Sequence, residues 1–210
     1  MRLYLVRHGE TEWNREHRVQ GQSDQPLNEA GRRQAEALAR AFADRPLAAA
    51  YSSPLRRAYD TAQAIARARG LSVQALDELK ELHVGVLDGL TFVEMRERYG
   101  DFMLRWREDA TLRLPGGGET LPDVQARAWP AIERIRQAHG GAQVVVVSHY
   151  FLTQVVLCTA LGLPLTHFRR LRLGEGSVSV LDFSPDGRAR VVALNDSCHL
   201  TADAGAAHAS

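Results

Sequence analysis

The chain has 210 residues, of which 45% are hydrophobic and 24% charged, and its 26 Lys and Arg against 25 Asp and Glu give a formal net charge of +1. This composition is typical of a soluble globular domain, and the near-zero charge argues against binding of nucleic acid or an anionic membrane through bulk electrostatics. Two cysteines are too few for a disulfide framework, and no apolar run approaches the length of a signal peptide or a membrane span, so we expect a cytoplasmic protein without a membrane role.

The first part of the chain alternates apolar runs with amphipathic segments. Leu3 to Val6 is an unbroken apolar run, which predicts a strand buried on both faces. Residues 28–42 carry apolar side chains at helical spacing behind an asparagine N-cap and predict a helix. A second strand is predicted at 48–51. It precedes a helix over 53–69, for which a Ser-Pro pair supplies the N-cap and the first helical position.

Two more helices and the clearest strand follow. A capping-box pattern at Thr91 predicts a helix that runs towards Trp106. A second cap at Thr120 predicts a helix that the glycine pair at 140–141 terminates. Consecutive valines at 144–147 then predict a strand that is buried on both faces.

The last part of the chain is predicted to hold a helix at 150–161 and a hairpin of strands at 178–183 and 190–194. Strands that alternate with amphipathic helices predict an α/β fold, a three-layer α/β/α sandwich around a mostly parallel sheet. Nothing in the sequence divides residues 1–200, so we expect one domain. The small and polar residues 201–210 predict a disordered tail.

Both of the best predicted strands end in a histidine. The first strand continues into Arg7, His8 and Gly9, and the valine strand continues into Ser148 and His149. If the strands are parallel neighbours, both imidazoles emerge at the edge of the sheet where ligands bind in such folds. One histidine alone could be structural. The pair favours a functional site, at which the bare backbone of Gly9 would let a ligand approach closely.

A series of short motifs surrounds these two histidines and extends over almost the whole chain. They are, in chain order, Arg7–Thr11 with Trp13-Asn14, Gly21, Pro26–Asn28, Ser52–Ala58 with Thr61-Ala62, Leu79–Leu82 with Gly85, Gly89–Thr91, Pro115–Glu119, Val147–His149, and Asn195-Asp196 with His199-Leu200. Together they resemble the histidine phosphatase superfamily, which includes cofactor-dependent phosphoglycerate mutases and many small phosphatases. The resemblance implies a phosphoglycerate mutase-like fold with a cap insertion at about 88–120.

The resemblance also implies the catalytic residues. His8 would be the nucleophile that becomes phosphohistidine, and Arg7, Arg57 and His149 would surround the transferring phosphoryl group. Arg57 is chosen over its neighbour because the family's arginine directly precedes alanine. Glu81 would be the general acid and then the general base, and we expect burial to raise its pKa although nearby cations act in the opposite direction. No metal or other cofactor is implied, because a cationic pocket can stabilise the transferred group.

Substrate contacts are less fully specified by the sequence. Asn14, Gln20 and Gly21 are expected phosphate-side contacts by resemblance. Tyr150 stands where the family usually has glycine, so its ring could narrow the pocket or stack on an organic leaving group. Glu175 replaces a frequent asparagine, and its charge would disfavour highly charged substrates. Residues without motif support are expected at the surface (His17, His139, His167, His208) or in the core (Trp106, Trp129).

The short cap segment predicts that water hydrolyses the phosphohistidine, instead of the phosphoryl group being transferred back to a substrate as in a mutase. The family's mutases carry a long insertion between the Glu81-like position and the second histidine, and a shorter cap leaves phosphohistidine open to water. We therefore expect a phosphomonoesterase acting on a small phosphorylated metabolite. Alternatives are a phosphoglycerate mutase, a non-catalytic phospholigand-binding domain and a metallohydrolase that uses His8, His149 and Glu81 as ligands. The cap arginines could bind a second anionic group or form an ordinary exposed helix face (Arg96, Arg98, Arg105, Arg107, Arg113). The sequence predicts no oligomeric state.

Overall fold

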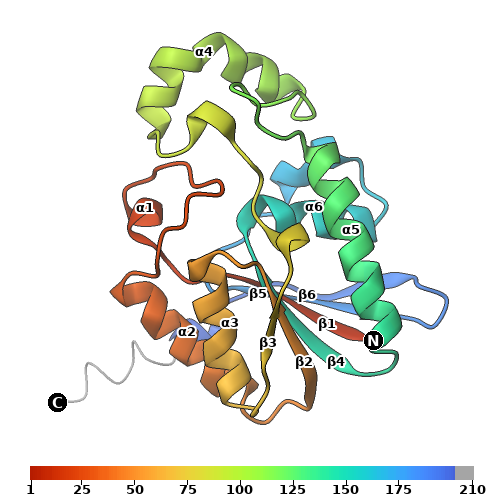
Figure 1. Ribbon diagram of the computed structural model, residues 1–210. Coiled ribbons are helices and arrows are strands. Elements are labelled where there is room, and N and C mark those ends of the chain that lie inside the picture. Colours follow the sequence, from red (N-terminus) through yellow and green to blue (C-terminus); the bar gives the residue numbers. More distant parts are fainter. Residues whose placement is uncertain (202–210) are drawn as a thin grey trace.

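The computed structural model describes residues 1–201, so all but the first residue of the predicted tail at 201–210 lies outside the described residues. A six-stranded sheet forms the centre, in the order β3-β2-β4-β1-β5-β6 (Figure 1). Its strands are β1 (Arg2–Arg7), β2 (Leu47–Ser52), β3 (Val73–Ala75), β4 (Gln143–Ser148), β5 (Val178–Phe183) and β6 (Ala189–Asp196).

The sheet is mostly parallel, as the alternation of elements predicts. β3, β2, β4 and β1 pair in parallel, and β5 and β6 add an antiparallel hairpin beside β1. The valine strand β4 lies between β2 and β1, which explains its continuous apolar sequence. β3 was not predicted, because Val73 is its one β-branched residue and its other two residues are exposed.

Helices cover both faces of the sheet and make the predicted three layers. α2 (Glu29–Phe42) and α3 (Arg56–Arg67) pack on one face, in a core cluster with Tyr4, Val6, Val145 and Val147. The alternate residues of β1 and β4 point the other way, towards α5 (Leu121–Ala138) and α6 (Tyr150–Ala160). The two-residue period of a strand thus places both faces of β1 and β4 in the core.

Three of the four predicted N-caps are confirmed and one is wrong. Asn28, Thr91 and Thr120 each accept a backbone N–H with their side chains at a helix start. α3 begins only at Arg56, however, because the Ser53 N–H still bonds the Val147 carbonyl in the sheet. The chain must turn after this bond before a helix can start.

α4 (Phe92–Glu108) lies at the top of Figure 1, on the side of the sheet where β1 and β4 end. The segments on either side of it meet, since the Val86 N–H donates to the Pro115 carbonyl. Gly85 has a φ of +59° and its added Cβ would lie 2.0 Å from the Pro115 oxygen, so the position requires glycine. The remaining short helices are α1 (Glu12–Arg15), α7 (Cys198–Thr201) and 3-10 turns at Asp77–Leu79, Gly85–Leu87 and Leu165–Arg170.

In the part of the chain that the structure describes, no helix combines the length and apolarity needed to cross a membrane.

Candidate active site

The two strand-end histidines lie side by side, as their position after parallel strands predicts. Arg7 of β1 is in register with Ser148 of β4, and the His8 N–H donates to the Ser148 carbonyl at 3.0 Å. The centroids of the His8 and His149 rings are 5.1 Å apart. Only 4% of His8 and 0% of His149 is exposed, so both imidazoles belong to the protein interior.

The glycine after His8 permits close packing between the site and a helix. A Cβ at Gly9 would lie 2.6 Å from the Gly31 carbonyl oxygen of α2, and the approach of a ligand to Gly9 stays a prediction. The Gly9 N–H donates to Thr61 Oγ1 of α3 at 3.1 Å, which restrains the backbone on this side as well. These contacts fix the backbone at His8.

His8 has the protonation state of a nucleophile. Its Nδ1 is 2.7 Å from the Gly9 carbonyl oxygen, which can only accept, so Nδ1 carries the hydrogen and Nε2 keeps its lone pair. Burial, together with the positive charges of Arg57 and Arg7, holds the pKa of His8 well below its usual value. The same causes lower the pKa of His149. Both rings are therefore neutral near pH 7.

Arg57 is a fully buried cation held by a loop. Its Nη1 and Nη2 donate to the Ser23 and Gly21 carbonyls, each at 2.7 Å. Asp88 in turn accepts the N–H groups of Gly21 and Ser23 at 3.1 and 3.2 Å. Burial lowers the pKa of Arg57 to about 10, which still leaves it charged at neutral pH. Gly21 thus positions Arg57 through its carbonyl.

Arg7 contacts both residues that depart from the family pattern, Glu175 and Tyr150. Its Nη2 forms an ion pair with Glu175 Oε1 at 2.7 Å, and its Nη1 donates to the Leu173 carbonyl at the same distance. The Arg7 Cζ lies 4.9 Å from the centroid of the Tyr150 ring, in a cation–π contact. Glu175 and Tyr150 therefore act on the guanidinium that the family resemblance places at the phosphate.

Several buried nitrogens of this group have no hydrogen-bond partner among residues 1–201. They are Arg7 Nε, Arg57 Nε, His149 Nδ1 and His149 Nε2. Buried donors rarely remain unpaired, because each then loses its bond to water without a replacement. Cationic and imidazole donors grouped around a nucleophilic nitrogen match the needs of a transferring phosphoryl group.

Glu81 is a buried carboxyl group at the start of α6. Its Oε1 accepts the Leu82 and Leu152 N–H groups at 2.8 and 3.1 Å, and its Oε2 accepts the Phe151 N–H at 3.1 Å. Burial raises the pKa of Glu81, against the lowering effect of these bonds and of Arg57. A carboxyl group that holds its proton more tightly than usual is suited to general acid catalysis. The geometry thus supports the role that resemblance gives to Glu81.

Sequence reasoning missed Arg127, which holds the Glu81 segment from α5. Its guanidinium donates to the carbonyls of Glu78, Lys80 and Glu81 at 2.6 to 2.9 Å. It also pairs with Glu119 at 2.8 Å, and Glu119 Oε2 accepts the His83 N–H. No local pattern distinguishes Arg127 from the other arginines of its helix, because most of these partners are distant in sequence.

We expect Arg127→Met to lower the free energy of unfolding by about 2–3 kcal/mol, because several carbonyls lose a charged donor. Displacement of Glu81 should also slow alkyl phosphate hydrolysis more than hydrolysis of an activated aryl phosphate. Arg134→Met is the matched control, since Arg134 of the same helix forms an exposed ion pair with the Glu78 carboxylate. Thermal melts and kcat for both esters test this. A loss of stability without any dependence on the leaving group would contradict the positioning role.

The other predicted substrate contacts lie in the segment after His8. The Thr11 N–H donates to Asn14 Oδ1 at 3.0 Å, and Gln20 Nε2 donates to Thr11 Oγ1 at 2.7 Å. Asn14 and Gln20 are thereby tied to the start of α1, and their contact with substrate stays a prediction. His139 was expected at the surface, but it is half-buried and 2.9 Å from the Tyr51 hydroxyl.

The cap arginines are all exposed (Arg96, Arg98, Arg105, Arg107, Arg113). Four of them lie on α4, which agrees with an ordinary exposed helix face, whereas Arg113 lies beyond the end of this helix. Trp129 packs partly buried against the core, as expected. Trp106 is also half-buried but lines a cavity. Across residues 1–201, no three His, Cys, Asp or Glu side chains are grouped in a way that could hold a metal ion.

Several known proteins are similar to this chain in sequence or in fold. Residues 3–197 match the model of the histidine phosphatase superfamily (branch 1). The chain is 37% identical over 200 residues to phosphoserine phosphatase 1 of Hydrogenobacter thermophilus, covering 95% of this chain and 94% of that protein. It is 36% identical over 192 residues to a probable phosphoglycerate mutase, GpmB, of Photorhabdus laumondii, covering 87% and 85%.

A solved structure of similar fold is the mycobacterial glucosyl-3-phosphoglycerate phosphatase Rv2419c in complex with VO3. Its TM-score is 0.86 at 36% identity, over 93% of this chain and 99% of that one. The chain spans only 55% of the length of relatives from Mycobacterium bovis and Mycobacterium tuberculosis that are 40% identical to it over 200 residues.

Proposed function

The chain belongs to the histidine phosphatase superfamily (branch 1), and from this we infer that it is a metal-independent phosphomonoesterase that works through a phosphohistidine on His8. The observation that carries the proposal is the pairing of a neutral His8, whose Nε2 lone pair is free to attack, with unpartnered nitrogens of Arg7, Arg57 and His149. The substrate class is a small phosphorylated metabolite.

In the first step, His8 Nε2 forms a bond to phosphorus and the bond from phosphorus to the ester oxygen breaks. Glu81 gives its proton to the departing oxygen, so that an alcohol leaves in place of an alkoxide. Arg7, Arg57 and His149 stabilise the negative charge on the phosphoryl oxygens. In the second step, the Glu81 carboxylate takes a proton from water, the water oxygen attacks phosphorus, and the nitrogen–phosphorus bond breaks to release phosphate.

A panel of phosphomonoesters, assayed for phosphate release without added metal and after exhaustive chelation, tests the proposal. We expect full activity after chelation and acid-quenched label on the protein from a 32P-labelled ester. Loss of activity on chelation that returning a metal restores would favour a metallohydrolase. No turnover and no label would favour a phospholigand-binding domain.

A second candidate function is phosphoglycerate mutase activity, because a relative at 36% identity carries that name. The experiment is incubation with 3-phosphoglycerate and a trace of the bisphosphate. We expect phosphate release to exceed interconversion of the phosphoglycerates. Faster interconversion would replace the phosphatase proposal.

The pH profile should reflect the two buried groups. In single turnovers of an alkyl phosphate, we expect no loss of rate as pH falls from 7 through the range in which an exposed histidine would titrate, because the lowered pKa of His8 keeps Nε2 unprotonated there. The rate should fall as pH rises past the raised pKa of Glu81, since the acid then lacks its proton. Half-loss of the rate near pH 6.5 on the acid side would contradict the assignment of His8.

Replacing Glu175 should change how the site binds anions. Glu175→Gln removes the negative charge beside Arg7 but keeps an oxygen that can accept from Nη2. We expect inorganic phosphate to inhibit about threefold to fivefold more tightly, a small effect because the Glu175 side chain is 32% exposed and partly screened. Glu133→Gln, which removes an equal charge from an ion pair with Arg136 on α5, is the control. Equal inhibition of both variants would show that Glu175 has no influence on the phosphate.

A further inference from the structure

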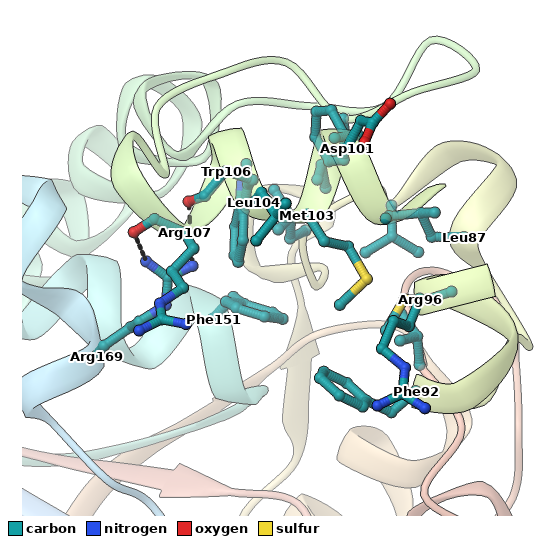
Figure 2. Close-up of a pocket in the computed structure, with 17 residues that line it drawn as sticks. Leu87, Phe92, Arg96, Asp101, Met103, Leu104, Trp106, Arg107, Phe151 and Arg169 are labelled. Carbon is teal, nitrogen blue, oxygen red and sulfur yellow. Dashed lines mark hydrogen bonds between the residues drawn. The ribbon is translucent and has the colours of Figure 1, made fainter. Parts of the chain in front are cut away.

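A large cavity lies between α4 and the body of the protein, and its walls are mainly apolar. Its volume is about 690 Å³, within the range that accommodates a complete small-molecule ligand. Figure 2 shows Met103 and Phe151 extending into this space from α4 and α6. The other apolar side chains that line it are Val19, Leu82, Val84, Leu87, Phe92, Met95, Phe102, Leu104, Trp106 and Leu114.

The cavity adjoins the proposed general acid. Leu82 and Phe151 both line it, and the N–H groups of these same residues hold Glu81 Oε1 and Oε2 at 2.8 and 3.1 Å. Phe151 also directly follows Tyr150, whose ring stacks on Arg7. A substrate whose departing oxygen lies at Glu81 would place the group attached to that oxygen beside Leu82 and Phe151, at the wall of the cavity.

Exposed apolar side chains surround the cavity on α4. Phe92 is 59% exposed and Leu104 is 63% exposed, and both belong to its lining. Large apolar side chains left exposed beside a cavity are typical of a ligand-binding surface, because water contact with them is unfavourable.

The wall at the C-terminal end of α4 is fixed by Arg169. Its guanidinium lies 4.5 Å from the centroid of the Trp106 ring. It also donates to the Trp106 and Arg107 carbonyls, each at 3.2 Å (Figure 2). Through these hydrogen bonds and the cation–π contact, Arg169 fixes the C-terminal end of α4 and the position of the Trp106 ring, which lines the cavity.

We propose that this cavity binds an apolar alcohol portion of the substrate, so that the enzyme hydrolyses phosphomonoesters of long-chain or aromatic alcohols. This proposal rests on the proposed phosphatase function and specifies its substrate class. The charged side chains Arg96, Asp101, Arg107 and Arg169 also line the cavity. Against its apolar walls, sugar, serine or glycerate esters carry hydroxyl, amino or carboxylate groups that would lose their bonds to water. An alkyl or aryl group makes no hydrogen bonds to water and therefore loses none on entering the cavity.

A series of n-alkyl phosphates from propyl to octyl measures the effect directly. Their leaving alcohols are nearly equal in acidity, so the chemistry stays constant while the apolar surface grows. We expect kcat/KM to rise about threefold to fourfold for each added methylene until the cavity is filled, the gain expected for transfer of one methylene from water. A flat series would overturn the proposal.

Two exposed positions of α4 provide matched variants. Leu104→Glu places a charge in the lining, whereas Val93→Glu places one at a residue of the same helix that is 54% exposed and outside the lining. We expect Leu104→Glu to lower kcat/KM for octyl phosphate at least tenfold and to lower it much less for propyl phosphate, whose short chain buries less apolar surface. Val93→Glu should change neither. Equal effects of the two variants would contradict the proposal.

Preference for a substrate that carries a carboxylate is the result that would overturn the proposal. If 3-phosphoglycerate has a higher kcat/KM than octyl phosphate, and Arg96→Ala or Arg107→Ala removes that advantage, the cavity binds anions and the proposal is wrong. If no ester releases phosphate, the proposed function fails. Saturable binding of 1-octanol, followed by calorimetry and weakened by Leu104→Glu but not Val93→Glu, would then support the apolar site on its own, and absence of binding would overturn it.

Discussion

His8→Ala is expected to abolish phosphate release from every ester, by at least about 10⁴-fold, because the proposed mechanism forms its covalent intermediate on His8. The fold should persist. His8 makes its side-chain hydrogen bond to the adjacent Gly9 carbonyl, while the strand pairing of β1 with β4 uses only backbone groups. Steady-state phosphate release and circular dichroism measure the two effects together.

Covalent 32P label on the protein distinguishes the nucleophile from the neighbouring residues that only stabilise charge. The wild-type chain and His149→Ala should both acquire acid-quenched 32P on the protein, more slowly in the variant, because the proposed mechanism gives His149 the role of stabilising charge without a bond to phosphorus. His8→Ala should retain none. Label on His8→Ala would assign the nucleophile to another residue.

Glu81→Gln is expected to slow hydrolysis of an alkyl phosphate about 10²- to 10⁴-fold, because an amide cannot supply the proton that the departing oxygen needs. An activated aryl phosphate should be slowed much less in its phosphorylation step, since a stable aryloxide leaves without protonation. Single-turnover rates for the two esters give the comparison. Equal slowing would remove Glu81 from the role of leaving-group acid.

The stability of this variant must be measured alongside its rates. The Glu81 carboxyl group accepts N–H groups from Leu82, Phe151 and Leu152 on its two oxygens, and an amide offers only one oxygen. We expect a loss of about 1–3 kcal/mol in the free energy of unfolding. Glu81→Asp, which keeps the acid, should recover part of the alkyl ester rate if the proton is what matters.

Local patterns in the sequence determined the frame of the fold. The valines of β4 identify a buried strand, because a strand covered on both faces needs apolar side chains at every position. Asn28, Thr91 and Thr120 identify helix starts, because a cap bonds a backbone N–H only a few residues away. The positions of His8 and His149 after two such strands predicted that they meet if the strands are parallel neighbours, and the parallel pairing of β1 with β4 confirms that condition.

Tertiary structure alone decided the chemistry around those two rings. Arg127 reaches carbonyls 46 to 49 residues away, and Arg7 pairs with Glu175, 168 residues away. The raised pKa of Glu81 depends on burial, which the charged run at 77–81 does not indicate and which only the family resemblance led us to expect. The apolar cavity under α4 likewise joins side chains from distant segments. Strands and caps depend on neighbours along the chain, whereas desolvation and charge pairing depend on neighbours in space, which exist only once the chain has folded.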